Sequence, residues 1–541
     1  SFFLPHCDRS HGRSYSVLPN MCAMSWISKP VRPLIREVGQ EPLVGGRTRS
    51  EWLMGLASPD VRVKCQTLSE IGELGDVAAS ALDLVPDIMS MLMDGAAKVR
   101  CAALAALGSM GEMAAGEAKA MLALLHDGSL EVRCAAIRAF GLVAGPAAGP
   151  ELAAEPAARL RPGAGGGAKL STAERAAAAE ALGAMRAAAF AGEVRAALRE
   201  EQDEEVLVAL LGTLAKWGDD AQTSLSDVAV HLSDARAGVR AAAVTALASA
   251  GDAAPGHAQA VVGLLWDADS CTRSAAVDFF KATGSLAARG GAAEQASRGL
   301  SDADGRVQAA CAMALGHMKA NKFADQVANL LNASYKGDTS VALSAAGLEP
   351  VLPATLRRPS CAAATALGLM GQEGAAHAAE VAKMLDGSGP EDVAAAARSL
   401  GRMGAEAHEE SIRSLLDDTS ALVREAACAA LGALAGSSES SPSADSVVAR
   451  LWDRHPAVRA TAAEALAEMR FEGPRYLDDV VRLLSDRVVS VQVAAARAVG
   501  ALMPRGRLYA PRLLLLAGSP AARPAARAAA VAALGEVLAA E

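Results

Sequence analysis

Hydrophobic residues recur along the chain with the period of an α-helix, inside a longer phrase that is itself repeated. From Leu92 to Gly111, the side chains of Val99, Ala103 and Leu107 fall on one face of a helix. The same phase returns with the Val, Ala and Leu residues of the stretches 423–434 and 491–502. A further apolar set precedes each of these helices. Each phrase therefore predicts two helices joined by a polar turn.

The phrase returns at an interval of about 33 residues. Arg100 and Arg133 are 33 residues apart, as are Arg240 and Arg273. With weaker copies between the clear ones, this spacing predicts about thirteen or fourteen two-helix units. Neither helix of a unit can bury its apolar stripe alone, so neighbouring units must stack and share one core. The predicted fold class is all-α, an α-solenoid (superhelix).

An aspartate recurs in the turn of each clear unit, five residues before the position of Val99. Its carboxylate can accept backbone N–H groups at the start of the second helix. It can also meet the arginine of a neighbouring unit. Both interpretations are structural.

The turn Asp, the Val-Arg that opens the second helix and the Ala-Leu-Gly that closes it resemble HEAT repeats, in particular the short HEAT-like variety, over about residues 51–541. The resemblance implies a hydrogen-bonded ladder of turn Asp and Arg side chains along the stack. Gln308 and Gln492 depart from this pattern, and we expect a weaker ladder there. The matching ladder residues are Asp94, Arg100, Asp127, Arg133, Asp234, Arg240, Asp267, Arg273, Asp418, Arg424, Asp453 and Arg459.

Three stretches interrupt the repeats, and the first 50 residues lack them. The predicted organisation is a disordered N-terminal segment (1–50), HEAT-like repeats (51–144), a Gly/Pro-rich loop (145–172), repeats (173–332), an irregular insertion (333–359) and repeats (360–541). The Ser-rich stretch 436–445 is a candidate for phosphorylation. An organelle transit peptide is the alternative for the first 50 residues, which are poor in acids.

Composition narrows the classes of function. Hydrophobic residues make up 52% of the chain and aromatics 3%, and the net charge is −9. With no basic surplus and few aromatics for base stacking, no nucleic-acid binding is expected. No apolar run reaches the length of a membrane span. The nine cysteines form no Cys-x-x-Cys pair, which favours a reduced, intracellular location that we expect to be cytoplasmic.

The search for catalytic or metal-binding motifs finds little. The Gly-rich run before Lys169 lacks the Gly that a phosphate-binding loop places directly before its Lys. His408-Glu409 is the one His-Glu pair, whereas the iron-binding HEAT-like hydroxylases use several. No cofactor, metal or catalytic residue is therefore predicted.

The sequence predicts a non-enzymatic scaffold or adaptor that binds other proteins through its curved surface. Trp266 and Trp452 precede the turn Asp and are candidate partner-binding residues, although each could equally be a packed repeat residue. Arg138 and Arg497 are further candidates. They occupy the outward position of the second helix, six residues after the position of Val99, where the residue type varies between units. Two alternatives remain open: a bilin (phycobiliprotein) lyase, which short HEAT-like repeats also resemble, and a cytoskeletal or trafficking adaptor with a charge-segregated surface.

Overall fold

The computed structural model describes residues 47–160, 170–332, 354–387, 389–435, 443–469, 476–502, 505–519 and 522–539. Over these residues the chain is helical and contains no β-strand, so the predicted all-α class is confirmed. In the same ranges, no helix combines the length and the apolar character needed to cross a bilayer.

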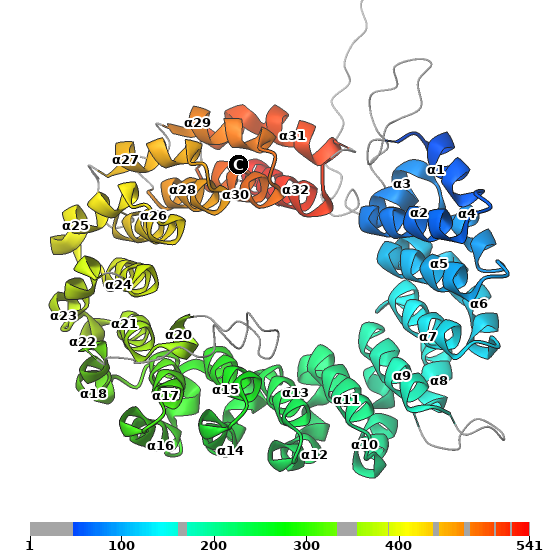
Figure 1. Ribbon diagram of the computed structural model, residues 1–541, viewed down its shortest axis with the longest axis horizontal. Helices are drawn as coiled ribbons and strands as arrows, with labels where there is room; N and C mark the ends of the chain where they lie inside the picture. The colour runs from blue at the N-terminus through cyan, green and yellow to red at the C-terminus, as the bar shows by residue number, and fades with distance from the viewer. Residues whose placement is uncertain are drawn as a thin grey trace, which may run out of the picture.

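Long helices stack side by side into a curved inner row (Figure 1). Within the described residues this row has fourteen members: α2 (Val61–Leu74), α5 (Ala97–Met110), α7 (Leu130–Ala144), α9 (Thr172–Ala184), α11 (Glu204–Trp217), α13 (Ala237–Ala248), α15 (Ser270–Thr283), α17 (Gly305–His317), α21 (Pro359–Leu369), α24 (Pro390–Met403), α26 (Ala421–Ala435), α28 (Pro456–Glu468), α30 (Val489–Ala501) and α32 (Pro524–Ala539).

Shorter helices form the outer row, and most are followed or preceded by a turn of 3₁₀-helix. They are α1 (Arg49–Leu56), α3 (Asp76–Leu82), α4 (Val85–Met91), α6 (Ala118–Met121), α8 (Pro150–Ala158), α10 (Ala191–Glu200), α12 (Leu225–Val230), α14 (Ala258–Val261), α16 (Ala292–Arg298), α18 (Ala324–Ala328), α22 (Gln372–Ala375), α23 (Ala378–Ala382), α25 (Glu409–Ser414), α27 (Ala444–Ala449), α29 (Leu477–Arg482) and α31 (Ala510–Gly518). One further short helix, α20 (Ala354–Arg357), packs against α17 and α21.

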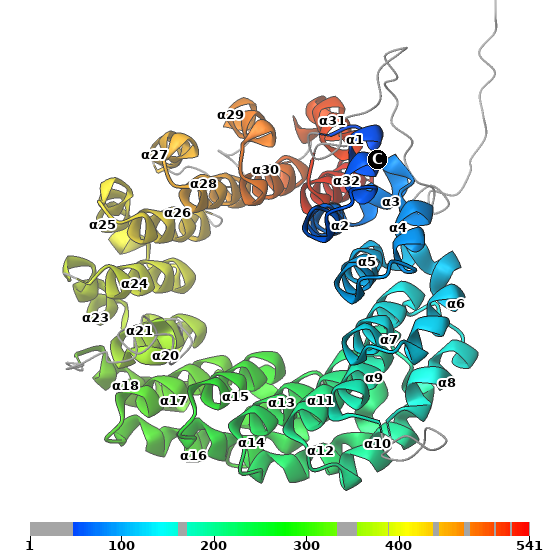
Figure 2. The ribbon, with the colours of Figure 1, turned by 45° about the vertical axis from the view of Figure 1, so that its right-hand side comes forward.

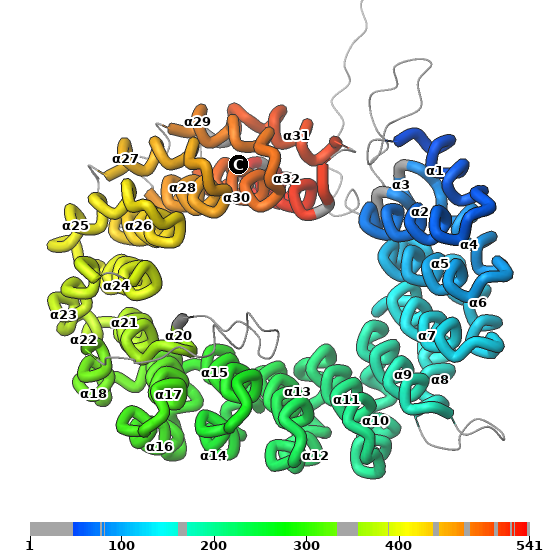
Figure 3. Tube along the Cα trace, in the orientation of Figure 1, coloured from blue at the N-terminus to red at the C-terminus, as the bar shows by residue number. Residues whose placement is uncertain are grey.

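The stack curves into an open ring, with the inner helices on its concave side (Figure 3). In both views the last unit, α31 and α32, returns to the side of the molecule where α1 and α2 lie (Figure 1, Figure 2). The predicted α-solenoid is therefore confirmed, and its curvature turns the array most of the way around one axis.

Small side chains let neighbouring inner helices approach closely. A Cβ on Gly141 of α7 would lie 2.5 Å from the Cα of Ala181 on α9, and one on Gly401 of α24 would lie 2.7 Å from the Cα of Ala430 on α26. Both distances are shorter than a real carbon contact, so the backbones touch where glycine stands. The shared core is built from Ala, Leu and Val, which are mostly fully buried.

Glycine follows many of the inner helices, in a conformation that differs from the left-handed cap common at helix ends. Gly111 has φ 54° and ψ −135°, and Gly145 has φ 59° and ψ −173°. Both combine a positive φ, which glycine tolerates, with an extended ψ. The chain therefore turns sharply into the outer row of the next unit.

The predicted boundaries need correction where the structure finds helix. Within the expected loop 145–172, Pro150–Ala158 form α8, because Pro150 occupies the first helical turn, where no N–H is needed. Thr48 caps α1 together with Glu51, so the repeats begin before residue 51. In the expected insertion 333–359, residues 354–357 are helical and Pro359 opens α21, whereas residues 333–353 lie outside the described part of the chain.

Candidate functional site

The turn aspartates and the inner-helix arginines join neighbouring units along one edge of the ring. The carboxylate of Asp127 accepts the backbone N–H of Ser129, two residues further on, at 2.8 Å. The guanidinium of Arg100 donates to the carbonyl of Asp94 in its own unit at 2.9 Å and to the carboxylate of Asp127 in the next unit at 2.8 Å. Each arginine thus fixes its own turn and binds the following one.

The same contact between units recurs along the stack. The guanidinium of each of three further arginines donates two hydrogen bonds to the carboxylate of the next unit, at 2.7 to 2.9 Å. These pairs are Arg240–Asp267, Arg424–Asp453 and Arg459–Asp486. Hydrogen bonding to Arg100 and to Arg424 holds the pKa of Asp127 and of Asp453, respectively, below its usual value.

Other residues continue the series where the repeat phrase is degenerate. Arg133 donates to Glu174 at 2.6 Å, and Arg175 donates to Glu201 at 2.9 Å. In the first unit Lys64 on α2 binds Asp94 of the next unit at 2.6 Å. Lys64 has the same charge as the arginine that it replaces, and Glu174 and Glu201 have the same charge as the aspartate. This charge is the sequence signal that could have identified them.

The series is interrupted between α15 and α17. Arg273 is 4% exposed and donates to the carbonyl of Asp267 at 2.7 Å, but its Nη2 has no hydrogen-bond partner. The carboxylate of Asp302, which would be its partner in the next unit, instead accepts the indole N–H of Trp266 at 3.0 Å. Burial and the nearby Arg306 lower the pKa of Arg273.

Glutamine replaces the ladder arginine at positions 308 and 492, and within the described ranges the contact with the next unit is missing at both. The amides of Gln308 and Gln492 donate to the carbonyls of Asp302 and Asp486 in their own units, each at 2.7 Å. Neither amide binds a carboxylate of the following unit among the described residues. The remaining predicted members, Asp234 and Asp418, accept N–H groups of Arg236 and Ser420 in their own turns.

The two candidate tryptophans differ in exposure. Trp266 is half-buried, and its ring lies 2.8 Å from where a Cβ on Gly299 would stand, so it fills the junction between two units. Trp452 is 57% exposed in the turn after α27. Trp266 is therefore a packing residue, and Trp452 is the tryptophan that a partner can reach.

The outward position of the inner helices lies on the concave face. One side of each helix packs on the outer row and two sides pack on neighbouring inner helices, so an exposed residue there faces the axis of the ring. Arg138 pairs with Glu180 on α9, and Arg497 on α30 is exposed. Exposed concave residues at this position are Ala105, Thr245, Asp278, Glu464 and Arg497.

Hollows in the described surface are open and shallow. One of about 380 Å³ lies between α2 and α5 and is lined by residues such as Ser69, Gly72 and Ala105. Another of about 550 Å³ lies at the ends of α5 to α11 and includes Glu112, Arg186 and Lys216. In the described ranges, no group of three or more His, Cys, Asp or Glu could hold a metal ion. Glu409, beside His408, accepts a hydrogen bond from Ser443 at 2.5 Å.

Comparison with known proteins supports the repeat assignment. Residues 378–453 match the family model for HEAT repeats. No curated protein sequence matches this chain significantly.

Solved structures with a similar course of the chain include karyopherins. One is the karyopherin Kap121p bound to the SUMO protease Ulp1p, with 13% identity and a TM-score of 0.45, where the match covers 91% of this chain and 60% of that one. Another is the Kap95:Nup1 complex, with 14% identity, a TM-score of 0.42, and coverage of 91% and 68%. The chain thus spans about three fifths of the Kap121p chain. The match over residues 378–453 confirms the predicted resemblance of the chain to the HEAT-repeat family.

Proposed function

We propose that the chain is a non-enzymatic scaffold or adaptor that binds a protein partner on the concave face of the ring. The observation that carries this proposal is the variety of exposed side chains at the outward position of the inner helices. Asp278 and Glu464 are negatively charged, Arg497 is positively charged, and Ala105 and Thr245 are small and uncharged. An irregular set of this kind suits a single irregular protein surface better than a polymer of identical units.

The stacked core makes this surface suitable for binding. The inner helices are held by contacts with both neighbours and, along one edge, by the Arg–Asp pairs between units. A surface already ordered before binding loses little conformational entropy when a partner docks. The concave face is therefore a preorganised platform.

The test is affinity purification of the full chain from a cell extract, with quantitative mass spectrometry. A concave variant carrying Asp278→Lys, Glu464→Lys and Arg497→Glu is compared with an outer-row variant carrying Glu151→Lys, Glu193→Lys and Lys383→Glu, all at exposed positions. We expect proteins that the wild type and the outer variant retain and the concave variant loses. Retention that is indifferent to the concave changes, or no retained protein at all, would contradict the proposal.

A trafficking or cytoskeletal adaptor is the second candidate, because charge is segregated along the array. Residues 487–541 contain seven arginines and two glutamates, although the whole chain has a net charge of −9. The bilin lyase alternative would require a deep pocket with converging polar groups, and the hollows in the described residues have the open form given above.

A further inference from the structure

The C-terminal end of the array, from the turn before α30 to α32, differs from the rest in charge. From Arg487 to Gly535 the sequence contains seven arginines and no acidic residue. Elsewhere most inner-face and edge arginines meet a carboxylate, as Arg138 and Arg424 do. Among the described residues, Arg487, Arg497, Arg512 and Arg523 are exposed and pair with no carboxylate. These four side chains place positive charge at the C-terminal end of the array without an ion pair among the described residues.

The same unit also exposes leucines. The outer helix α31 buries Leu513 and Leu516 and leaves Leu514 60% and Leu515 63% exposed. Leu508, in the turn before α31, is 76% exposed. Scattered exposed leucines are ordinary on protein surfaces, but here three lie within eight residues of one another, and Arg512 lies among them.

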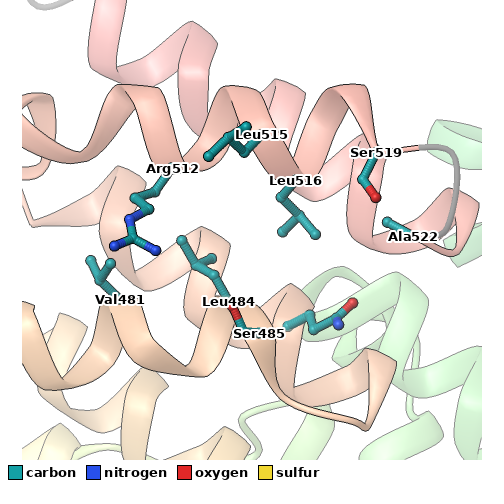
Figure 4. A pocket seen from close by; sticks show the side chains of 9 residues that line it. Val481, Leu484, Ser485, Arg512, Leu515, Leu516, Ser519 and Ala522 are labelled. Carbon is teal, nitrogen blue, oxygen red and sulfur yellow. The ribbon is translucent and has the colours of Figure 1, made fainter. Parts of the chain in front are cut away.

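A hollow of about 290 Å³ lies among these side chains. Leu484 and Leu516 point toward it from opposite sides, and Arg512 reaches down from α31 toward Val481 (Figure 4). Its rim includes the polar residues Ser485, Gln492 and Ser519. The hollow therefore combines an apolar floor with a positive charge at one end and hydrogen-bonding groups at its edge.

The end of the Arg–Asp series leaves this hollow open. Gln492 occupies the place of the ladder arginine and binds the carbonyl of Asp486 in its own unit. In the units of Arg100 and Arg424 this edge is closed by the arginine and the carboxylate of the unit that follows. Here the amide replaces the arginine, and Gln492 also lines the hollow.

We propose that this surface, which we name the C-terminal groove (Leu484, Gln492, Arg512, Leu515, Leu516), docks an acidic segment of another protein that inserts a leucine-like side chain. The aliphatic side chain occupies the apolar floor, and a neighbouring carboxylate of the partner binds Arg512. The rim residues can bond the partner's backbone. Binding sites of this type combine an apolar lining with a few polar groups that fix orientation.

Charge and shape favour a protein segment over nucleic acid or a membrane. An aromatic ring for base stacking would have to come from Tyr509, whose hydroxyl is bonded to Asp478. A membrane contact would use a protruding apolar face, whereas the leucines here surround a hollow with polar edges. The groove is lined mainly by α29, α31 and the turns that follow them, and none of the exposed concave residues named above lines it.

The test begins with selection of random 16-residue peptides, displayed on phage, against the full-length chain. The most enriched peptide is then labelled and titrated by fluorescence anisotropy. We expect selected peptides to carry Asp or Glu on both sides of an aliphatic residue, and their affinity to fall as salt rises. Peptides without acidic enrichment, or no enriched peptide, would overturn the proposal.

Matched variants localise the binding. Arg512→Glu and Leu515→Asp should each reduce the affinity of the chain for the selected peptide by about ten-fold or more, which corresponds to about 1.4 kcal/mol. Arg289→Glu and Leu130→Asp change exposed residues of the same types elsewhere and should leave affinity unchanged. Circular dichroism checks that all four variants fold. Equal binding by all variants would refute the site.

Two competitors distinguish the other classes of ligand. A 20-nucleotide single-stranded DNA and vesicles of phosphatidylcholine with phosphatidylserine are titrated against the wild type and the Arg512→Glu variant. We expect neither to displace the peptide at physiological salt. DNA or vesicle binding that is tighter than the peptide and lost in Arg512→Glu would reassign the groove to nucleic acid or to a membrane.

Discussion

At the scale of single residues, one arginine performs two tasks in each complete unit. Arg424 is 4% exposed and donates to the carbonyl of Asp418 in its own turn while it binds both carboxylate oxygens of Asp453 in the next. Bidentate pairing of this kind fixes geometry as well as supplying energy. The pair therefore sets the register between two neighbouring units.

Removing one partner of the Arg424–Asp453 pair should destabilise the two helices that it joins. Arg424→Leu leaves the buried carboxylate of Asp453 without its cation, and we expect a loss of about 3 kcal/mol in the free energy of opening α26 and α28. Hydrogen exchange of the amides in these helices measures it. The exposed Arg454→Leu is the control and should change little. The double variant Arg424→Leu with Asp453→Leu should be less destabilised than Arg424→Leu alone, and equal destabilisation would contradict a paired contact.

The half-buried His317 predicts how stability depends on pH. Burial, together with Lys281 and Arg402, lowers the pKa of His317 from 6.5 to about 4. Between these values the unfolded chain binds a proton that the folded chain excludes, so stability falls as the pH drops through this window. The thermal midpoint of the wild type should therefore decline between about pH 7 and pH 5, and His317→Leu should reduce the decline. The exposed His126→Leu serves as the control; an unchanged decline in His317→Leu would contradict this prediction.

Sequence alone identified many of the side chains that join the units, because the same phrase recurs in them. It missed Lys64, Glu174 and Glu201, where a residue of suitable charge replaces the repeated one. The roles of Trp266 and Trp452 could not be separated from sequence, since exposure depends on what lies opposite. Gly299 lets the ring of Trp266 pack into a junction, whereas Trp452 remains exposed.

At the scale of helices, the closeness of the inner row depends on glycine at particular positions. Gly141→Ala would place a Cβ 2.5 Å from the Cα of Ala181, so α7 and α9 must move apart. We expect destabilisation of about 1–3 kcal/mol. Gly212 lies in α11 with nothing within 4 Å of its would-be Cβ, and Gly212→Ala should stabilise by up to about 1 kcal/mol through helix propensity.

Thermal denaturation followed by circular dichroism compares the two glycine variants. Opposite signs are the expected outcome, because both substitutions gain the same helix propensity and only one meets backbone. A stabilised Gly141→Ala would mean that the inner helices tolerate wider spacing than the structure shows.

The expected loop 145–172 was wrong in part because a helix can contain proline. Four prolines between residues 145 and 167 suggested a loop, yet α8 forms with Pro150 in its first turn and Pro156 buried within it. Burial of Ala153, Pro156 and Ala157 against the stack compensates for the hydrogen bond that Pro156 cannot make. Tertiary packing therefore decided an element that local propensity disfavoured.

At the scale of the whole molecule, the array is one continuous stack with a weak junction. Between α15 and α17, Arg273 lacks a carboxylate partner and Asp302 binds Trp266 instead. On α5, α7 and α26 a glycine lies nine residues after the Val near the start of the helix. On α15, where Thr272 replaces that Val, the corresponding residue is Lys281. Both features loosen the contact between these two units.

This junction should open at lower free energy than its neighbours. We expect amides of α15 and α17 to exchange faster in native-state hydrogen exchange than those of α26 and α28, which the Arg424–Asp453 pair joins. Stability in such arrays is a sum over units and their interfaces, so one weak interface lowers protection locally. Slower exchange at α15 and α17 than at α26 and α28 would contradict the proposed weak junction.

The most direct test of the proposed concave binding is carboxyl footprinting of the chain with and without a captured partner. Carbodiimide labelling followed by mass spectrometry compares Asp278 and Glu464 on the concave face with Glu151 and Glu193 on the outer row, all of which are exposed in the free chain. We predict that the partner protects the first pair and leaves the second labelled. Protection confined to Glu151 and Glu193 would contradict binding within the ring.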